Sequence, residues 1–334
     1  MTARPPPAHP EKELHAVDNG AGWKLALRRT LASGTRQGRP VVIVPGYQMN
    51  SSVFGFHPNG ASLEEHLAAR GLEVWSVDLR GQGSSARTWG ETRFGLSELA
   101  IEDLGAAIAY ARAAARSDAV DVIGCSLGTA LAFAHIACVP DAKVASVVAM
   151  GGVVTWGHVN RALRTVARAP WIVGRFRMTG TRKLARAALP VVARVAPKLL
   201  SIYLNVESTD TSQPDALVAT VEDPNPVMNR QIARWLVNRE LVVRGRGDAA
   251  RVNVSRALGA MTLPFLCVNG RQDGVVPPET SRLIYEAIGS ADKTLLEVGD
   301  AQTPMAHADL FLARRAEELV FEPVAKWLLA RSWG

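Results

Sequence analysis

The chain has 334 residues, of which 48% are hydrophobic and 21% are charged, and its formal net charge is +7. This composition excludes a disordered chain and is ample for a large apolar core. The sequence contains no apolar run of the about 18 residues that a transmembrane helix requires, and no apolar stretch at its start that would act as a secretory signal. We therefore expect a cytoplasmic protein.

The cysteines agree with that expectation. Cys125, Cys138 and Cys267 lie far apart in apolar segments, and no two of them form a CxxC pair. Such spacing is typical of buried, reduced thiols and not of a disulfide framework or a zinc site. We expect no metal, and no cofactor either, because no glycine-rich dinucleotide fingerprint follows the first apolar run.

The first elements in chain order are a solvated tail at residues 1–10 and an antiparallel hairpin. ELHAVDNG and GWKLALRRTL predict the two hairpin strands, which turn near Asn19 and Gly20. Six apolar runs follow, at residues 41–44, 72–77, 120–124, 144–150, 263–269 and 294–298. Their apolarity is largely continuous and does not alternate, which indicates strands buried on both faces, as in a parallel sheet.

Helical patterns separate these runs. Apolar residues recur every three or four positions in five segments, at 63–70, 97–116, 126–138, 278–288 and about 308–331. The alternation of strands and helices predicts the α/β class, with a mostly parallel, doubly wound sheet.

One interval breaks the alternation. About a hundred residues separate the run that ends near Gly152 from the run that begins at Leu263, and a structureless loop of that length is improbable. We predict an inserted helical cap at 155–250, with the α/β core formed by 11–154 and 251–334. HVNRALRTVAR and TRKLARAALPVVARV read as amphipathic cap helices, and we expect Pro190 to break the second of them.

The cap carries the positive charge of the chain. Eleven Lys and Arg residues and no Asp or Glu lie between Lys143 and Val206. They form the ordinary solvated face of amphipathic helices, or they rest on an anionic membrane surface. In the second case the apolar contact would come from Trp156, Trp171, Ile172 and Phe176. Nucleic-acid binding is disfavoured, because no aromatic platform or recognition motif accompanies the arginines.

The motif with the clearest chemistry is Gly124-Cys125-Ser126-Leu127-Gly128. It follows the run VDVIG and precedes the helical pattern TALAFAHIA, and this strand–turn–helix context gives G-x-S-x-G its meaning. The turn lifts the serine hydroxyl clear of the sheet, and the following helix N-terminus directs N–H groups at the reacting centre. Ser126 is therefore the predicted nucleophile.

A serine hydroxyl needs a base, and the base needs an acid to orient it. Asp273 follows the run LPFLCVNG, and His307 follows TLLEVGD just before the last helical pattern. Both positions are at the carboxyl end of a predicted strand, where open α/β sheets build their sites. Asp300 and Asp309 are the rivals for the acid role; for Asp309, next to a helix start, an N-cap role is the stronger interpretation.

These motifs resemble the α/β-hydrolase superfamily over nearly the whole chain except the cap and tail. PGYQMNSSVF at 45–54 resembles its oxyanion loop, with Pro45 in place of the usual histidine, and DLRGQGSS at 78–85 resembles its Asp-x-Arg-Gly-x-Gly-x-Ser turn. More narrowly, GWKLAL, SLEEHLAARGLEVWSVDLRGQG and HADLF resemble the acid-lipase and polyhydroxyalkanoate-synthase branch. The synthases have cysteine at the centre of the elbow, so Ser126 favours hydrolysis over polymerisation.

The resemblance implies further roles. The oxyanion would be bound by the main-chain N–H groups of Tyr47 and Leu127. Asp78 and Arg80 are interpreted as residues that hold a turn, and Cys125 as a buried thiol that faces away from the site.

The predicted function is hydrolysis of carboxylic esters by an esterase or lipase acting on a small acyl ester. An acyltransferase or thioesterase on the same triad is one alternative. A non-catalytic α/β-hydrolase scaffold is another, disfavoured because a binding protein does not need all three of Ser126, Asp273 and His307.

Overall fold

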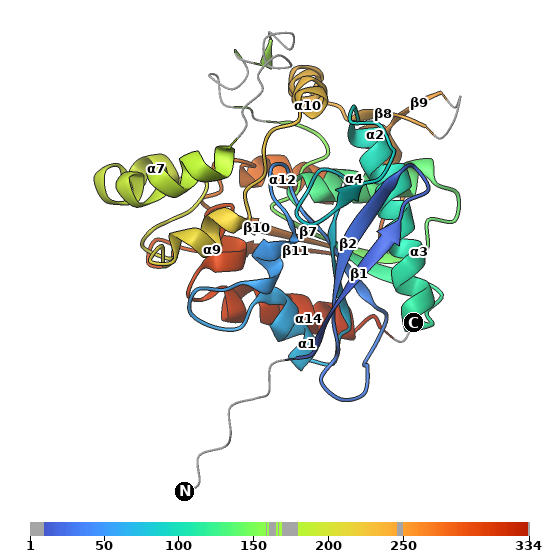
Figure 1. Cartoon of the computed structure of the whole chain (residues 1–334), viewed down its shortest axis with the longest axis horizontal. Coiled ribbons are helices and arrows are strands. Elements are labelled where there is room, and N and C mark those ends of the chain that lie inside the picture. The colour runs from blue at the N-terminus through green and yellow to red at the C-terminus, as the bar shows by residue number, and fades with distance from the viewer. Residues whose placement is uncertain are drawn as a thin grey trace, which may run out of the picture.

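The computed structural model describes residues 10–157, 159, 165, 167–168, 180–245 and 250–332. Within these residues the central feature is a sheet of nine strands (Figure 1). Its strands are β1 (Lys12–Asp18), β2 (Trp23–Thr30), β3 (Val41–Val44), β4 (Val74–Asp78), β5 (Ala86–Arg87), β6 (Val120–Cys125), β7 (Val144–Met150), β10 (Phe265–Gly270) and β11 (Lys293–Val298). The predicted hairpin and all six predicted strands are confirmed.

The strand order is β1-β2-β4-β3-β6-β7-β10-β11, and β5 pairs with β2 at the side. From β4 to β11 neighbouring strands are parallel, whereas β1–β2 and β2–β4 are antiparallel. The hairpin turn is held by Asn19, whose Oδ1 accepts hydrogen bonds from the N–H groups of Ala21 and Trp23. Because the carboxyl ends of parallel strands share one edge, this order brings the ends of β6, β7, β10 and β11 together.

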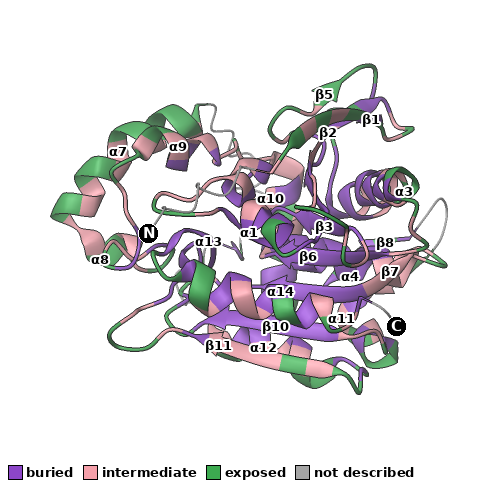
Figure 2. Ribbon diagram, turned by 90° about the horizontal axis from the view of Figure 1, so that it is seen from below, coloured by how far each residue is buried: buried purple, intermediate pink, exposed green. Residues whose placement is uncertain are grey.

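Helices cover both faces of the sheet, so the central strands β3, β4, β6 and β10 are buried on both sides (Figure 2). Along β3, for example, Val42 and Val44 belong to one core and Val41 and Ile43 to the other. The first core contains α3 (Leu104–Ala115), α4 (Leu127–Cys138) and α12 (Pro278–Ala287); the second contains α1 (Leu63–Ala69), α13 (Asp309–Leu312) and α14 (Glu322–Leu329). Two apolar faces explain the continuous apolar runs.

The C-terminal helix was predicted wrongly as one element. α13 ends at Leu312, Ala313 is extended, and the chain turns back into a helix only at η4 (Glu317–Phe321), which leads into α14. Ala313 forms an antiparallel bridge with Thr209, and the N–H of Arg314 donates to Ser208 O. These contacts with the inserted segment draw the backbone out of the helix.

The described part of the insertion between β7 and β10 contains several helices and one short hairpin (Figure 1). It contains α7 (Thr181–Val195), α8 (Pro197–Leu200), α9 (Pro214–Ala219) and α10 (Pro226–Asn238), and then the hairpin β8 (Val242–Arg244) and β9 (Arg251–Asn253). Most of HVNRALRTVAR lies outside the described residues. α7 continues through Pro190, contrary to the expected break; Pro190 is exposed, so water can reach the carbonyl that loses its helical partner.

The remaining short elements connect the larger ones. They are η1 (Ser51–Gly55), α2 (Leu96–Glu98), η2 (Leu99–Asp103), α11 (Val254–Ala257) and η3 (Leu258–Ala260). Among the helices that the structure describes, none combines the length and the apolarity needed to cross a bilayer.

Candidate active site

Ser126 lies in the sharp turn between β6 and α4. Its backbone has φ 51° and ψ −115°, a conformation that costs a residue with a side chain of the order of 1–3 kcal/mol. The turn is fixed by three hydrogen bonds: Ser126 N donates to Met150 O (2.9 Å), Thr129 N donates to Ser126 O (3.1 Å), and Thr129 Oγ1 donates to Gly124 O (2.7 Å). The surroundings therefore hold the serine in this conformation.

The two outer glycines of the motif permit the close approach that the turn requires. A side chain at Gly124 would meet the backbone of Thr129, with a Cβ–Cα distance of 2.5 Å, and one at Gly128 would collide with the carbonyl of Val44 on β3. The motif thus packs α4 directly against the sheet, as the sequence predicts.

His307 and Asp273 are joined by a short hydrogen bond. His307 Nδ1 lies 2.6 Å from Asp273 Oδ2, and both side chains are buried, with 5% and 3% of their residue surfaces exposed. The other carboxylate oxygen, Oδ1, accepts from the N–H groups of Val275 (2.9 Å) and Val276 (2.8 Å). Asp273 therefore has a fixed orientation toward the imidazole.

The end of β7 contacts both the Ser126 turn and the His307–Asp273 pair. Met150 O accepts the N–H of Ser126, and the next residue, Gly151, packs on the pair. A Cβ at Gly151 would lie 3.0 Å from His307 Nδ1 and 3.3 Å from Asp273 Oδ2. Gly151 also has φ 56°. The sequence gives no specific signal for this glycine, because GG after an apolar run also suits an ordinary turn.

The rival acids have other partners. Asp309 accepts from the N–H groups of Asn205 and Ala306 and from Thr209 Oγ1 (2.6 Å). Burial raises the pKa of its carboxyl, and these donors oppose the rise. Asp309 is the first residue inside α13 and not its N-cap, which is Ala308. Asp300 accepts from the N–H groups of Gln302 and Thr303 in a surface turn.

A cavity of about 280 Å³ opens beside Ser126, and Tyr47 and Leu127 line it too. The loop that carries Tyr47 packs closely on Ser126, since a Cβ at Gly46 would lie 3.0 Å from Ser126 Cβ. The other lining residues, nearly all apolar, come from the core and the insertion: Val153, Trp156, Ala167, Asn229, Ile232, Ala233, Trp235, Leu236, Val275 and Val276.

Asn229, on α10, is a polar residue that the insertion contributes to the lining of this cavity. It was not among the predicted site residues. The Tyr47 hydroxyl donates to Asn229 Oδ1. Burial raises the pKa of the Tyr47 phenol, which keeps the hydroxyl protonated as a donor. An asparagine in an amphipathic helix carries no sequence signal for such a contact with a loop 182 residues away.

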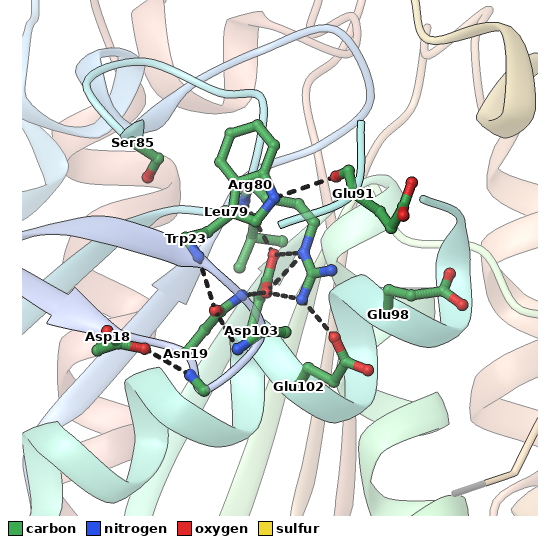
Figure 3. Close-up of polar contacts among 12 residues, drawn as sticks. Asp18, Asn19, Trp23, Leu79, Arg80, Ser85, Glu91, Glu98, Glu102 and Asp103 are labelled. Carbon is green, nitrogen blue, oxygen red and sulfur yellow. Dashed lines mark hydrogen bonds and ion pairs between the residues drawn. The ribbon is translucent and has the colours of Figure 1, made fainter. Parts of the chain in front are cut away.

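Asp78 and Arg80 hold turns, as predicted. Asp78 accepts the N–H groups of Ser51 (2.8 Å) and Ser84 (3.0 Å), so it ties the loop after β3 to the turn after β4. Arg80 is buried and donates to both oxygens of Asp103 and to Glu102, as Figure 3 shows.

Cys125 is a buried thiol that lies 3.9 Å from the sulfur of Met49. Burial raises the pKa of this thiol, so it stays protonated and is a poor nucleophile. The interpretation of Cys125 as a structural residue is confirmed.

Comparison with known proteins places this arrangement in a family. Residues 38–299 match the family model described as serine aminopeptidase, S33. Over 288 residues the chain is 27% identical to a pimeloyl-(acyl-carrier protein) methyl ester esterase of Aeromonas hydrophila, and the match covers 83% of this chain and 93% of that protein.

Solved structures share the fold. A soluble variant of monoglyceride lipase from Saccharomyces cerevisiae matches with a TM-score of 0.65 at 16% identity, over 100% of both chains. An esterase from Exiguobacterium antarcticum matches with a TM-score of 0.60 at 16% identity, over 94% of this chain and 98% of that one. The narrower resemblance to acid lipases and polyhydroxyalkanoate synthases stays a prediction. Because the family model spans most of the chain, from β3 through the Ser126 turn to the Asp273 loop, the chain belongs to the serine aminopeptidase S33 family and is an esterase- and lipase-like α/β-hydrolase.

Proposed function

We propose that this α/β-hydrolase cleaves carboxylic esters with Ser126 as nucleophile, His307 as base and Asp273 as orienting acid. The observation that carries the proposal is the buried 2.6 Å bond between His307 Nδ1 and Asp273 Oδ2, packed on the strand end that also binds Ser126. That bond occupies Nδ1 and leaves Nε2 as the nitrogen that takes the serine proton.

In the proposed reaction, Ser126 Oγ attacks the acyl carbonyl while its proton passes to His307. The imidazolium then gives that proton to the leaving alcohol as the ester C–O bond breaks, and an acyl-enzyme remains. Water attacks the acyl-enzyme with His307 as base, which releases the acid and restores the serine. Asp273 stabilises the imidazolium throughout.

The oxyanion formed in both steps would be bound by the main-chain N–H groups of Leu127 and Tyr47. Leu127 begins α4, where the N–H groups of the first turn have no partner within the helix and the helix dipole favours negative charge. Tyr47 lies on the loop that packs on Ser126 through Gly46. Two such donors stabilise charge that develops in the transition state.

The apolar cavity beside Ser126 supports an acyl group of medium length as the part of the substrate that is buried. The name of the Aeromonas relative describes a methyl ester esterase, which supports an ester as the substrate class. We expect turnover of p-nitrophenyl esters to rise from acetate to medium chains, because each methylene buried in the cavity adds about 0.8 kcal/mol.

A substitution that fills the cavity tests whether the acyl group of the substrate binds there. Ala233→Phe places a ring in the cavity wall on α10, so kcat/KM for the best medium-chain ester should fall about tenfold or more relative to acetate. The measurement is the chain-length series with both proteins. Val242→Phe, on the exposed face of β8, is the matched control and should leave the preference unchanged. An Ala233→Phe enzyme with the wild-type preference would place the acyl chain elsewhere.

We also propose a cytoplasmic location. It is supported by the three cysteines, all free, of which Cys125 and Cys267 are buried.

We also propose contact with an anionic membrane surface, through residues other than the four named in the sequence analysis. Trp156 is buried and packs against Trp235 at 5.7 Å, so it is not available to lipid, and Trp171, Ile172 and Phe176 lie outside the described residues. α7 and α8 instead expose an apolar stripe with basic residues beside it: Leu184, Val191, Val195 and Leu199, flanked by Lys183, Arg194 and Lys198. Such a surface suits the lipid interface.

We expect the protein to sediment with vesicles that contain phosphatidylglycerol at low salt, and less with pure phosphatidylcholine vesicles. Leu199→Glu should weaken this binding severalfold, because it puts a negative charge in the apolar stripe, whereas Val242→Glu, on a different exposed apolar position, should not. Equal binding by the Leu199 variant would exclude this surface as the lipid contact.

A further inference from the structure

The oxyanion loop of this protein, residues 45–54, is held by the inserted segment that leads into α10. Met49 forms an antiparallel bridge with Val221. On either side of that bridge, Glu222 N donates to Gln48 O (2.8 Å) and Asn50 N donates to Thr220 O (3.0 Å). The loop therefore forms a short ladder with residues 220–222, far away in the sequence.

The loop needs such support because its backbone is strained. Gln48, directly after the proposed oxyanion donor Tyr47, has φ 56°, a left-handed conformation that costs a residue with a Cβ about 1–2 kcal/mol. A residue in this conformation persists only where its surroundings hold it. Loss of that support would let the Tyr47 N–H turn away from the position of the oxyanion.

The centre of the support is the carboxylate of Glu222. Its Oε1 accepts from Asn50 Nδ2 (2.6 Å), from Gly83 N (2.9 Å) and from Arg182 on α7 (3.1 Å). Asn50 is 2% exposed, and its amide uses its other donor on Ala219 O (2.9 Å) and its oxygen on Ser52 N (3.0 Å). One carboxylate thus joins the oxyanion loop, the turn after β4 and the basic helix.

We propose that Glu222 is a positioning residue for ester hydrolysis, which acts through Asn50 to keep the Tyr47 N–H aimed at the oxyanion. This role rests on the proposed function. It makes docking of the inserted segment on the loop a condition for transition-state stabilisation, because the loop residues that directly follow Tyr47 are held in a hydrogen-bonded ladder with that segment. Removing one oxyanion donor costs about 10²–10³ in kcat where this has been measured, so loosening one should cost less.

The test is a set of substitutions at positions 50 and 222. Asn50→Asp sets two carboxylates against each other and should lower kcat for a p-nitrophenyl ester about tenfold or more, with KM changed less than about threefold. Glu222→Gln keeps an oxygen that can accept from Asn50, Gly83 and Arg182, so this variant should retain most of the wild-type kcat. Glu222→Ala should lower kcat in the same manner as Asn50→Asp.

Asp215→Asn is the matched control, because it removes another carboxylate of the inserted segment, one paired with Arg186 on α7 and without a contact to the loop. The melting temperature of each variant is measured first, and the assay temperature is set below the lowest of them. An Asn50→Asp enzyme with wild-type kcat, or a Glu222→Ala enzyme no slower than Glu222→Gln, overturns the positioning role. A wild-type protein that neither cleaves esters nor reacts with a fluorophosphonate rejects the proposed function and this role with it.

Discussion

Replacing Ser126 with alanine is expected to lower kcat for p-nitrophenyl butyrate by about 10⁴-fold or more, because no other hydroxyl can take the place of the nucleophile at the strained turn. The backbone of the turn is held by Met150 O, Thr129 and the two glycines, none of which the substitution changes. The variant should therefore fold like the wild type while its chemistry is lost.

Covalent labelling separates this loss from a loss of binding. A fluorophosphonate probe should modify the wild-type protein at Ser126 and leave the Ser126→Ala protein unmodified. Cys125→Ala, at the neighbouring buried position, is the matched control and should still be labelled, because that thiol faces Met49. Labelling that persists in the Ser126 variant would assign the nucleophile to another residue.

The sequence was sufficient for the sheet, because a strand that is buried on both faces is apolar at nearly every position, and a buried exception such as Asp121 has polar partners in Arg39 and Ser146. VVIV at β3 and VDVIGC at β6 are fully buried, and the structure has them where their composition predicts. The Ser126 turn was equally predictable, since its glycines are needed for local reasons: each lies where a Cβ would meet the backbone of a neighbouring element. Asp273 and His307 followed from one rule, that sites form beyond the carboxyl ends of parallel strands.

What the sequence did not reveal depends on contacts between distant segments. Asn50 and Glu222 are 172 residues apart, and neither belongs to a recognisable motif. The break after α13 also depends on a distant segment, because Ala313 forms a bridge with Thr209 and Arg314 N donates to Ser208 O. Local periodicity records which face of a helix is apolar, but it carries no information on which loop that helix will meet.

The role proposed for Asp273 as the orienting acid can be tested by one substitution. Asp273→Asn should lower kcat about 10⁴-fold, because the amide can present an N–H to His307 Nδ1 and so favour the tautomer that cannot accept the serine proton. The shape of the side chain and its contacts with the N–H groups of Val275 and Val276 are retained, so the melting temperature should change little.

Asp309→Asn is the discriminating control, because this buried carboxylate lies two residues from His307 and was the rival acid. Its donors are the N–H groups of Asn205 and Ala306 and the hydroxyl of Thr209, which tie the inserted segment to the histidine loop. The substitution should lower the melting temperature and, in protein that is still folded, reduce kcat far less than Asp273→Asn does. If kcat instead collapsed in the Asp309 variant and survived in the Asp273 variant, the orienting acid would be Asp309, and the 2.6 Å bond between His307 and Asp273 would be only structural.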